Sequence, residues 1–255
     1  MALTLEQVLA GEIYGFLLVL VRVGAALSML PGFGEMAVPM RARLAAALAV
    51  ALALSAVVPG LPAGPPAAPS DLLAQIAGEF AAGMVIGIGA RILFAGLQIA
   101  GQIMAQTAGL SNIFALPGTG FEAGSVVGGY LMIGGLVLIF VTDLHHTLLG
   151  ALLDSYRLMP AATLPAMGPL AQITAGAVTD AFRLAAQVAA PFLVLGFVYN
   201  VGLGLINRAM PHFAVFFIGL PVSILGGFVL MAVTLSAVLT GFLAAYGGFL
   251  QRFGG

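Results

Sequence analysis

Long apolar stretches with almost no charged residue make up most of this chain, and they limit how it can fold. Residues 72–106 carry a helical pattern without proline, and they are longer than a helix needs to cross the roughly 30 Å hydrocarbon core of a bilayer. Only 7% of the residues are charged and 62% are hydrophobic, whereas about a quarter of a soluble domain is charged. The predicted fold class is therefore all-α, a polytopic integral membrane protein in which residues 1–255 form one membrane-embedded unit.

About six apolar helical units are predicted, separated by segments rich in proline, glycine or charge. Residues 59–70, PGLPAGPPAAPS, are expected to form an extended linker outside the bilayer, and Asp71 is the expected N-cap of the helix after it. Pro191 should kink the fifth unit, and the sixth is either one long bent helix or a tight hairpin, because Pro221 and two glycines interrupt it. The units are 13–30, 44–58, 72–106, 125–140 with its continuation 148–153, 173–205 and 213–246.

Several classes of function have no support in the sequence. All eight basic residues counted as Lys or Arg are arginines and the net charge is −1, so a role in binding nucleic acid is not indicated. No cysteine is present to act as a thiolate nucleophile or metal ligand. The G-x-S-x-G, P-loop and H-E-x-x-H motifs are absent, so neither an enzyme nor a bound cofactor is expected. The N-terminus lacks a basic region before the first apolar run, and we expect it to be retained.

Charged residues inside the apolar stretches need a partner. Arg22 can snorkel to the membrane surface, pair with a carboxylate on another helix or face a polar cavity, and an ion pair is the preferred interpretation. Gly83-x-x-x-Gly87 is a close-packing motif, since glycines let a second backbone approach. Glu79 and Arg91 extend the same ridge by one turn on each side. This ridge is therefore expected to contact another helix.

Three amides repeat at every fourth position further along the same stretch, so they line one face of the expected helix. An amide stripe in contact with lipid would leave its hydrogen-bonding groups unpaired. The stripe either forms hydrogen bonds between helices, which is the preferred interpretation, or lines a water-filled passage. It consists of Gln98, Gln102 and Gln106.

A second ridge of small and polar side chains lies in residues 191–221, which are otherwise strongly apolar. An arginine facing lipid costs roughly 2.5 to 3.5 kcal/mol on insertion scales, whereas glycines let another backbone come close. The ridge is therefore expected to contact protein, and a proline ends the helix after it. The residues of this expected interface are Gly196, Asn200, Gly204, Asn207, Arg208, Pro211 and His212.

Two segments of the chain resemble the FliR family, the R subunit of the flagellar protein-export gate, which has relatives in virulence-type type III secretion systems. One is residues 200–221, NVGLGLINRAMPHFAVFFIGLP, which is similar to the signature region of the family with His212 where a glutamine is usual. The other is residues 100–111, AGQIMAQTAGLS, with Gln102 where relatives often carry a glutamate. The resemblance implies a subunit of the export gate in the bacterial inner membrane, at the flagellar basal body, through which unfolded flagellar proteins are exported.

The resemblance also implies an architecture and a set of partners. Family members look like a P-type subunit fused to a Q-type subunit, with helical hairpins that spiral together with separate P-type and Q-type subunits and contact a B-type subunit. By this resemblance residues 1–124 are the P-like part and residues 125–255 are the remainder with the Q-like hairpin.

A glycine-rich segment at residues 108–124 corresponds to the segment that forms a plug in the closed export channel of the family. Irregular backbone at membrane depth is tolerated only inside protein or against water, although an ordinary loop outside the bilayer is the alternative. Apolar side chains in it would seal the channel by contact and dewetting. The expected plug residues are Leu110, Ser111, Asn112, Ile113, Phe114, Leu116 and Pro117.

Asp143, His145 and His146 follow the fourth apolar unit. A metal site is not expected, because two adjacent histidines fall on different faces of a helix and no second ligand cluster exists. A buried pair of Asp143 and His145 that fixes a helix bend is the preferred interpretation, and a proton-coupled switch is the other. The alternative function is a self-contained secondary transporter or channel, for which inverted repeats with converging ionisable residues are typical. No such repeat is visible.

Overall fold

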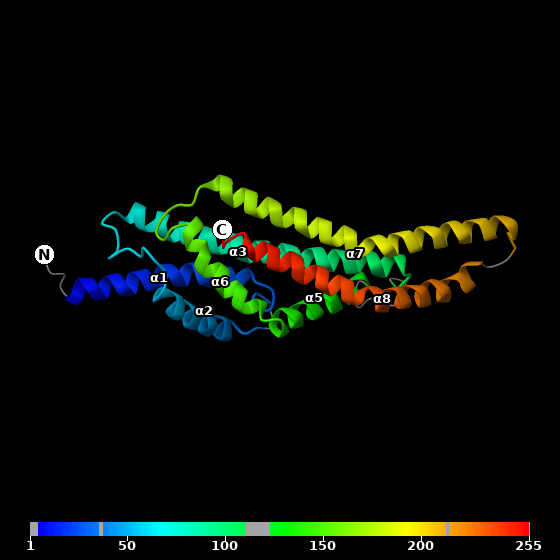
Figure 1. Ribbon diagram of the computed structural model, residues 1–255, viewed down its shortest axis with the longest axis horizontal. Helices are drawn as coiled ribbons and strands as arrows, with labels where there is room; N and C mark the ends of the chain where they lie inside the picture. The colour runs from blue at the N-terminus through cyan, green and yellow to red at the C-terminus, as the bar shows by residue number, and fades with distance from the viewer. Residues whose placement is uncertain (1–4, 36–37, 111–122, 213–214, 255) are drawn as a thin grey trace. The chain divides into compact units, whose positions relative to one another are not determined.

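The chain forms helices without strands over the residues that the computed structural model describes, which are 5–35, 38–110, 123–212 and 215–254 (Figure 1). The all-α fold class predicted from the sequence is confirmed. The helices are α1 (Leu5–Met29), α2 (Met40–Ser55), α3 (Pro69–Thr107), α5 (Ala123–Val141), α6 (Leu144–Leu158), α7 (Met167–Ala209) and α8 (Val215–Gln251).

Four of these helices are long and apolar enough to cross a bilayer on their own, namely α1, α3, α7 and α8. The predicted fourth unit is divided into α5 and α6, which are separated by a break of two residues. The two helices qualify as a fifth span only when they are counted together. At 16 residues, α2 is shorter than the roughly 20 residues that a span needs. The molecule is thus a polytopic membrane protein, and its described residues contain four or five segments that are long and apolar enough to span a bilayer.

The start of α3 differs from the sequence prediction. Asp71 is not the N-cap, because α3 begins at Pro69 and the carbonyl of Ala68 already accepts a hydrogen bond from the Asp71 amide, with N and O 3.1 Å apart. Proline suits the first position of a helix, where its missing N–H would have no partner. Asp71 instead lies in the first turn, where its negative charge is favourable near the positive end of the helix dipole.

Prolines inside α7 and α8 do not end these helices. Both continue through their proline, Pro191 in α7 and Pro221 in α8. The sixth apolar unit is therefore one long helix, and the hairpin alternative for it is wrong. Pro211, by contrast, follows the last residue of α7 by two positions, as predicted for a helix stop.

The chain packs as two compact units whose segments interleave along the sequence. The first unit consists of Met1–Ile92, Thr142–Val178 and Tyr246–Gly255, and the second of Leu93–Val141 and Thr179–Ala245. As a consequence, α3, α7 and α8 each contribute one part to each unit.

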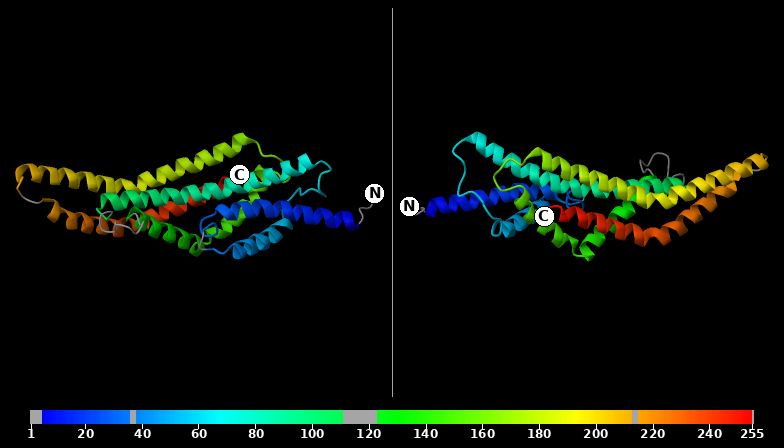
Figure 2. Two further views of the ribbon diagram at one scale, coloured as in Figure 1. Left: turned by 180° about the vertical axis from the view of Figure 1, so that it is seen from behind. Right: turned by 45° about the horizontal axis from the view of Figure 1, so that its top comes forward.

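In the first unit, α1 and α2 lie side by side (Figures 1 and 2). The side of α2 that is buried carries Ala47 and Ala51, whose small side chains let the helices approach. The end of α8 packs in the same unit, with the ring of Phe249 against Gly89 of α3. The ring of Phe253 meets that of Phe249 edge to face, with the ring centres 5.5 Å apart.

In the second unit, glycines set the closest helix contacts. A Cβ atom on Gly101 of α3 would lie 2.5 Å from the Cα atom of Gly128 in α5, so these two backbones touch. The rings of Phe94 and Phe242 join α3 to α8, with centres 4.8 Å apart in an edge-to-face arrangement. The adjoining parts of α7 and α8 form a hairpin (Figure 2).

Candidate subunit interfaces and channel segment

A buried ion pair joins α1 to α3 in the first unit. The Nε atom of Arg22 lies 2.7 Å from Oε2 of Glu79, and the two side chains are 1% and 0% exposed. The ion pair predicted for Arg22 is therefore confirmed. Its partner is the first residue of the glycine ridge on α3, 57 positions away, and sequence reasoning did not connect the two.

The rest of the Arg22 guanidinium binds α6 and the chain that follows it. Nη1 donates to Oγ of Ser155 at 3.0 Å, and Nη2 donates to the carbonyl oxygen of Met159 at 2.9 Å. The guanidinium also lies over the ring of Tyr156, 3.6 Å from its centre, which adds a cation–π contact. All three nitrogens of the guanidinium group thus have a partner, as a buried charge requires.

The second oxygen of Glu79 is also satisfied. Its Oε1 accepts a hydrogen bond from the backbone N–H of Ala162 at 2.9 Å, and Ala162 has a positive φ of 58°. The carboxylate therefore holds the connection between α6 and α7 against α3. Sequence reasoning missed this contact, because one partner is a backbone amide and every residue except proline carries one.

The glycines next to Glu79 bring α1 and α3 into backbone contact. A Cβ atom on Gly83 would collide with the carbonyl oxygen of Arg22, and one on Gly87 would lie 2.6 Å from the carbonyl oxygen of Ala26. The close-packing role predicted for this ridge is confirmed at both glycines. Arg91, at the far end of the ridge, is exposed.

The amide stripe Gln98, Gln102 and Gln106 is exposed along α3 in the second unit. The backbone and the Cγ atom of Gln98 pack against Gly128, so this part of α3 is fixed against α5 while the amide faces outward. Both predicted roles of the stripe, contact between helices and the lining of a wet passage, therefore remain predictions.

The end of α3 is fixed at the point where the predicted plug segment begins. Gly109 adopts a positive φ of 73°. The N–H of Leu110 donates to the carbonyl of Ala105 at 2.9 Å, and the N–H of Gly109 donates to that of Gln106 at 3.2 Å. These two bonds form a Schellman motif, the usual way in which a glycine ends a helix.

Leu110 is buried in a small apolar cluster that secures this turn. Its neighbours in the cluster are Ala105, Ala108 and Val127, and Ile224 and Met231 of α8 pack against it. Leu110 therefore anchors the segment. The other predicted plug residues, Ser111, Asn112, Ile113, Phe114, Leu116 and Pro117, lie outside the residues that the structure describes.

The ridge predicted on α7 is buried only at its first residue. Gly196 packs against Thr107 of α3, whose Cβ atom would lie 3.3 Å from a Cβ atom on the glycine. Asn200 donates from Nδ2 to the carbonyl oxygen of Gly196 at 2.7 Å, so its amide finds a partner within its own helix. Gly204 has open space beside it, with nothing within 4 Å of an added Cβ atom.

The remaining residues of the ridge are exposed, and none of their side chains forms a hydrogen bond or ion pair with another helix in the described part of the chain. The exposed members are Asn200, Gly204, Asn207, Arg208, Pro211 and His212. The interface expected at this ridge therefore remains a prediction.

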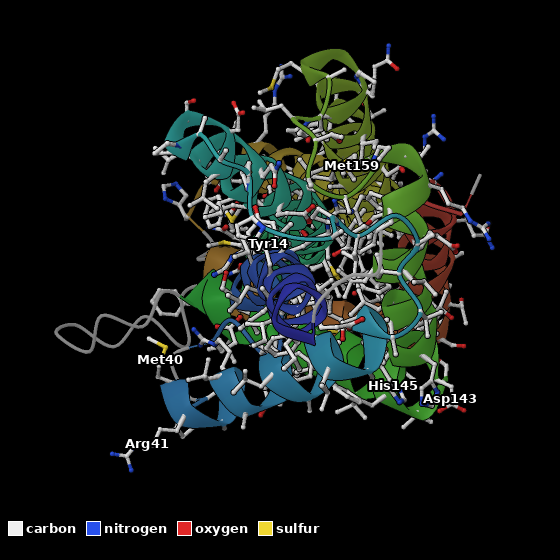
Figure 3. All side chains as sticks on the ribbon, turned by 90° about the vertical axis from the view of Figure 1, so that its left-hand side faces the viewer. Tyr14, Met40, Arg41, Asp143, His145 and Met159 are labelled. Atoms are coloured by element: carbon white, nitrogen blue, oxygen red, sulfur yellow. The ribbon has the colours of Figure 1, made fainter. Side chains whose placement is uncertain are left out.

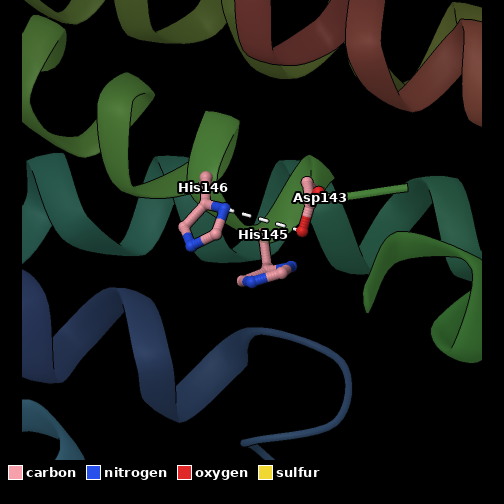
Figure 4. Close-up of side chains that lie close together, drawn as sticks. All are labelled: Asp143, His145 and His146. Atoms are coloured by element: carbon pink, nitrogen blue, oxygen red, sulfur yellow. Dashed lines mark ion pairs between the residues drawn. The ribbon is translucent and has the colours of Figure 1, made fainter. Parts of the chain in front are cut away.

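The group at the start of α6 differs from its prediction. Asp143 has a positive φ of 57° and lies in the break between α5 and α6, so the predicted interruption at this place exists. The carboxylate of Asp143 lies close to His146, with Oδ1 and Nδ1 3.7 Å apart (Figure 4), and both side chains are mostly exposed. A residue and its third neighbour share one face of a helix, which explains this approach. The prediction of a buried pair is wrong.

The two imidazole rings also approach each other, with their centres 4.1 Å apart. The argument that adjacent histidines must point apart therefore does not hold here. Ligand atoms of Asp143, His145 and His146 lie within 4.8 Å of one another, which is compatible with a metal ion. The local ion pair accounts for the approach of Asp143 and His146 without a metal, and we assign none.

Comparison with known proteins identifies a family and several named relatives. The sequence model of bacterial export proteins, family 1, matches residues 13–248. The chain is 32% identical to the flagellar biosynthetic protein FliR of Caulobacter vibrioides over 229 residues, which cover 90% of this chain and 91% of that protein. It is 27% identical to the protein of the same name from Bacillus subtilis over 227 residues, which cover 88% and 86%.

A relative with a different name is also found. The chain is 30% identical to the Yop proteins translocation protein T of Yersinia pestis over 154 residues, which cover 59% of each chain. The family match extends over nearly the full sequence, and the FliR relatives align along most of their own length. The chain therefore belongs to the FliR family, family 1 of the bacterial export proteins.

Proposed function

We propose that this protein is a non-enzymatic subunit of the flagellar type III protein-export gate in the inner membrane, at the flagellar basal body. The observation that carries the proposal is the alignment with flagellar FliR of Caulobacter vibrioides over 90% of the chain. The alignment with the Yersinia pestis translocation protein covers 59%, so a flagellar rather than an injection-type apparatus is the better supported choice.

The exposed ridge of α7 supports an assembly with other subunits. It places Arg208, Asn207 and Gly204 on the outside of a helix of bilayer length, where lipid would leave the polar groups without hydrogen-bond partners. A neighbouring helix would bind the polar groups and pack on the glycine. The partners are P-type and Q-type gate subunits, and a B-type subunit contacts the same assembly.

The division of the chain follows from the same proposal. Residues 1–124 form a P-like part and residues 125–255 contain a Q-like hairpin, for which the antiparallel pair α7 and α8 is the candidate. In this arrangement the exposed faces of the hairpin join those of neighbouring subunits. The amide stripe at Gln98, Gln102 and Gln106 then contacts a partner subunit or lines the export path.

The segment that follows Leu110 is the proposed plug of the channel. Support comes from the Schellman turn at Gly109 and the buried Leu110, which together give the segment a fixed starting point. Apolar side chains at 113, 114 and 116 close the resting channel, and the segment moves aside for an unfolded substrate. Energy for export comes from other parts of the apparatus, since the sequence has no nucleotide-binding motif.

Co-purification from the native membrane tests the assignment. The full chain carries an affinity tag after Gly255 and is extracted in a mild detergent, and the bound proteins are identified by mass spectrometry. Recovery of P-type and Q-type subunits in one complex of defined mass supports the export gate. A stable monomer or homodimer without those subunits contradicts it and favours a self-contained transporter.

A further inference from the structure

Helix α2 buries its small side chains and exposes its large apolar ones, whereas a helix of a soluble protein buries its large apolar side chains. Its buried side carries the small residues Ala47 and Ala51, and its large residues point outward. The outward residues recur at every fourth position and therefore form one ridge. They are Met40, Leu44, Leu48 and Leu52, with exposed fractions of 74%, 54%, 39% and 67%.

Water is an unsuitable neighbour for this ridge. Residues 44–53, LAAALAVALA, contain only leucine, alanine and valine, so the exposed face of the helix has no polar side chain from its second turn to its end region. Soluble helices place polar residues on the face opposite their packed side. The face of α2 is therefore covered by apolar groups that do not belong to the described part of this chain.

The residue types favour lipid over another protein as the cover. Contacts between membrane helices use small residues, as the contact of Gly83 with α1 does, whereas large aliphatic side chains are suited to acyl chains. The alanines of α2 are used in its contact within the first unit, and the leucines remain outside.

The arginines at the start of α2 add a charge to one end of the ridge. Arg43 is held within the chain, since it donates from Nε to the carbonyl of Phe33 at 2.7 Å and from Nη2 to that of Glu35 at 3.0 Å. Arg41 is exposed and forms no ion pair within the described residues. Figure 3 shows its guanidinium pointing away from the other helices.

We propose that α2 is a lipid-contacting helix that binds an anionic phospholipid. Acyl chains pack along the ridge of Met40, Leu44, Leu48 and Leu52, and the guanidinium of Arg41 binds the phosphate of the headgroup, for which arginine is well suited. At 16 residues α2 is roughly 24 Å long, so it reaches from the headgroups into the hydrocarbon core without crossing it.

Lipid contact is measured with single cysteines, which is simple because the chain has none. The full chain, with any subunits that co-purify, is placed in nanodiscs and labelled with an environment-sensitive fluorophore at Leu48→Cys, Leu52→Cys or the control Gly64→Cys, an open site in the connection between α2 and α3. Lipids with a spin label in the acyl chain should quench Leu48→Cys and Leu52→Cys several-fold more than the control. Equal quenching at all three sites, or protection of both α2 sites by a bound subunit, overturns the proposal.

The headgroup is tested by native mass spectrometry of protein from nanodiscs that contain phosphatidylglycerol and phosphatidylcholine. Wild-type protein should retain more phosphatidylglycerol than phosphatidylcholine. The Arg41→Gln variant should retain several-fold less phosphatidylglycerol than the wild type. Arg157→Gln is the matched control, because Arg157 is also exposed but pairs with Asp154 in its own helix. Retention that is unchanged in Arg41→Gln, or lowered equally in both variants, contradicts a specific site at Arg41.

Discussion

The Nε atom of Arg22 donates to Oε2 of Glu79 at 2.7 Å, and this contact joins α1 and α3 at a place that water does not reach. The same two side chains also bind Ser155, the carbonyl of Met159 and the amide of Ala162. One ion pair thereby connects three helices and the connection that precedes α7. It explains how a charged residue can lie within the first apolar stretch of the sequence.

Removal of one partner of this pair should destabilise the protein strongly. Glu79→Ala leaves the Arg22 charge buried without its counterion, which typically costs about 3–5 kcal/mol. We expect little monodisperse protein after extraction and a clearly lower thermal midpoint in size-exclusion chromatography of heated samples. Arg91→Ala, which removes an exposed arginine from the same helix, should behave like wild type.

A double variant distinguishes loss of the pair from loss of packing. Arg22→Met combined with Glu79→Leu removes both charges while it retains most of the buried volume, and such replacements are often close to neutral. The double variant should therefore be more stable than Glu79→Ala. If it is no more stable, the hydrogen bonds to Ser155, Met159 and Ala162 matter more than the ion pair itself.

Gly83→Ala should weaken the contact between α1 and α3. The added methyl group collides with the carbonyl oxygen of Arg22 and lies 2.9 Å from the Cβ atom of Ala25, so the helices must separate, at a cost of roughly 1–3 kcal/mol. Gly24→Ala on α1 is the control, because nothing lies within 4 Å of its added Cβ atom. A thermal midpoint that falls equally in both variants would argue against the backbone contact.

Gly109→Val should disturb the start of the plug segment without disrupting the helices. Valine in the left-handed conformation costs about 1–2 kcal/mol, and its Cβ atom would lie 2.9 Å from Oγ of Ser223. We expect a small loss of stability and a larger rise in membrane permeability to small solutes. Gly129→Val, in open space on α5, should change neither the stability nor the membrane permeability. Equal effects in the two variants would contradict the anchoring role of Gly109.

Deletion of residues 111–117 tests the plug itself. Gly109 and Leu110 stay in place, so α3 keeps its Schellman turn and the complex should still assemble. The membrane should then become leaky to ions or small molecules that the wild-type gate excludes. Unchanged permeability in a variant that still co-purifies with its partners would remove the plug assignment.

Gly204→Leu should impair assembly with partner subunits without impairing the folding of this chain. Gly204 has nothing within 4 Å of an added Cβ atom in this chain, so the substitution should change the stability of the isolated subunit by less than about 0.5 kcal/mol. The added side chain should nevertheless keep a neighbouring helix away and reduce co-purification of partner subunits several-fold. Normal assembly would indicate that Gly204 faces lipid or water.

The helices were largely predictable, because apolar length and proline position determine them locally. The start of α3 differs from the sequence prediction by three residues, because Pro69 rather than a residue after Asp71 takes the first helical position. The sequence alone does not decide whether α8 continues through Pro221. A proline costs one hydrogen bond, and the tertiary surroundings rather than the local sequence decide whether the helix continues.

The contacts between distant segments were less predictable. The sequence indicated that Arg22 pairs with a carboxylate, but only the fold brings Glu79 to it. The acceptor at Met159 and the donor at Ala162 are backbone groups, which no motif distinguishes. At the start of α6 the helical register brings His146 close to Asp143, and both side chains are exposed, which an apolar pattern does not determine.

Crosslinking from the exposed ridge of α7 tests the central claim most directly, namely that this chain is one subunit of a multi-subunit export gate. Asn207→Cys gives a unique attachment site for a photoactivatable maleimide in native membranes, because the chain has no cysteine. The account predicts adducts with P-type or Q-type gate subunits from Asn207→Cys and none from Gly168→Cys, an open site at the other end of α7. Adducts only with lipid, or only with a second copy of this chain, would contradict it.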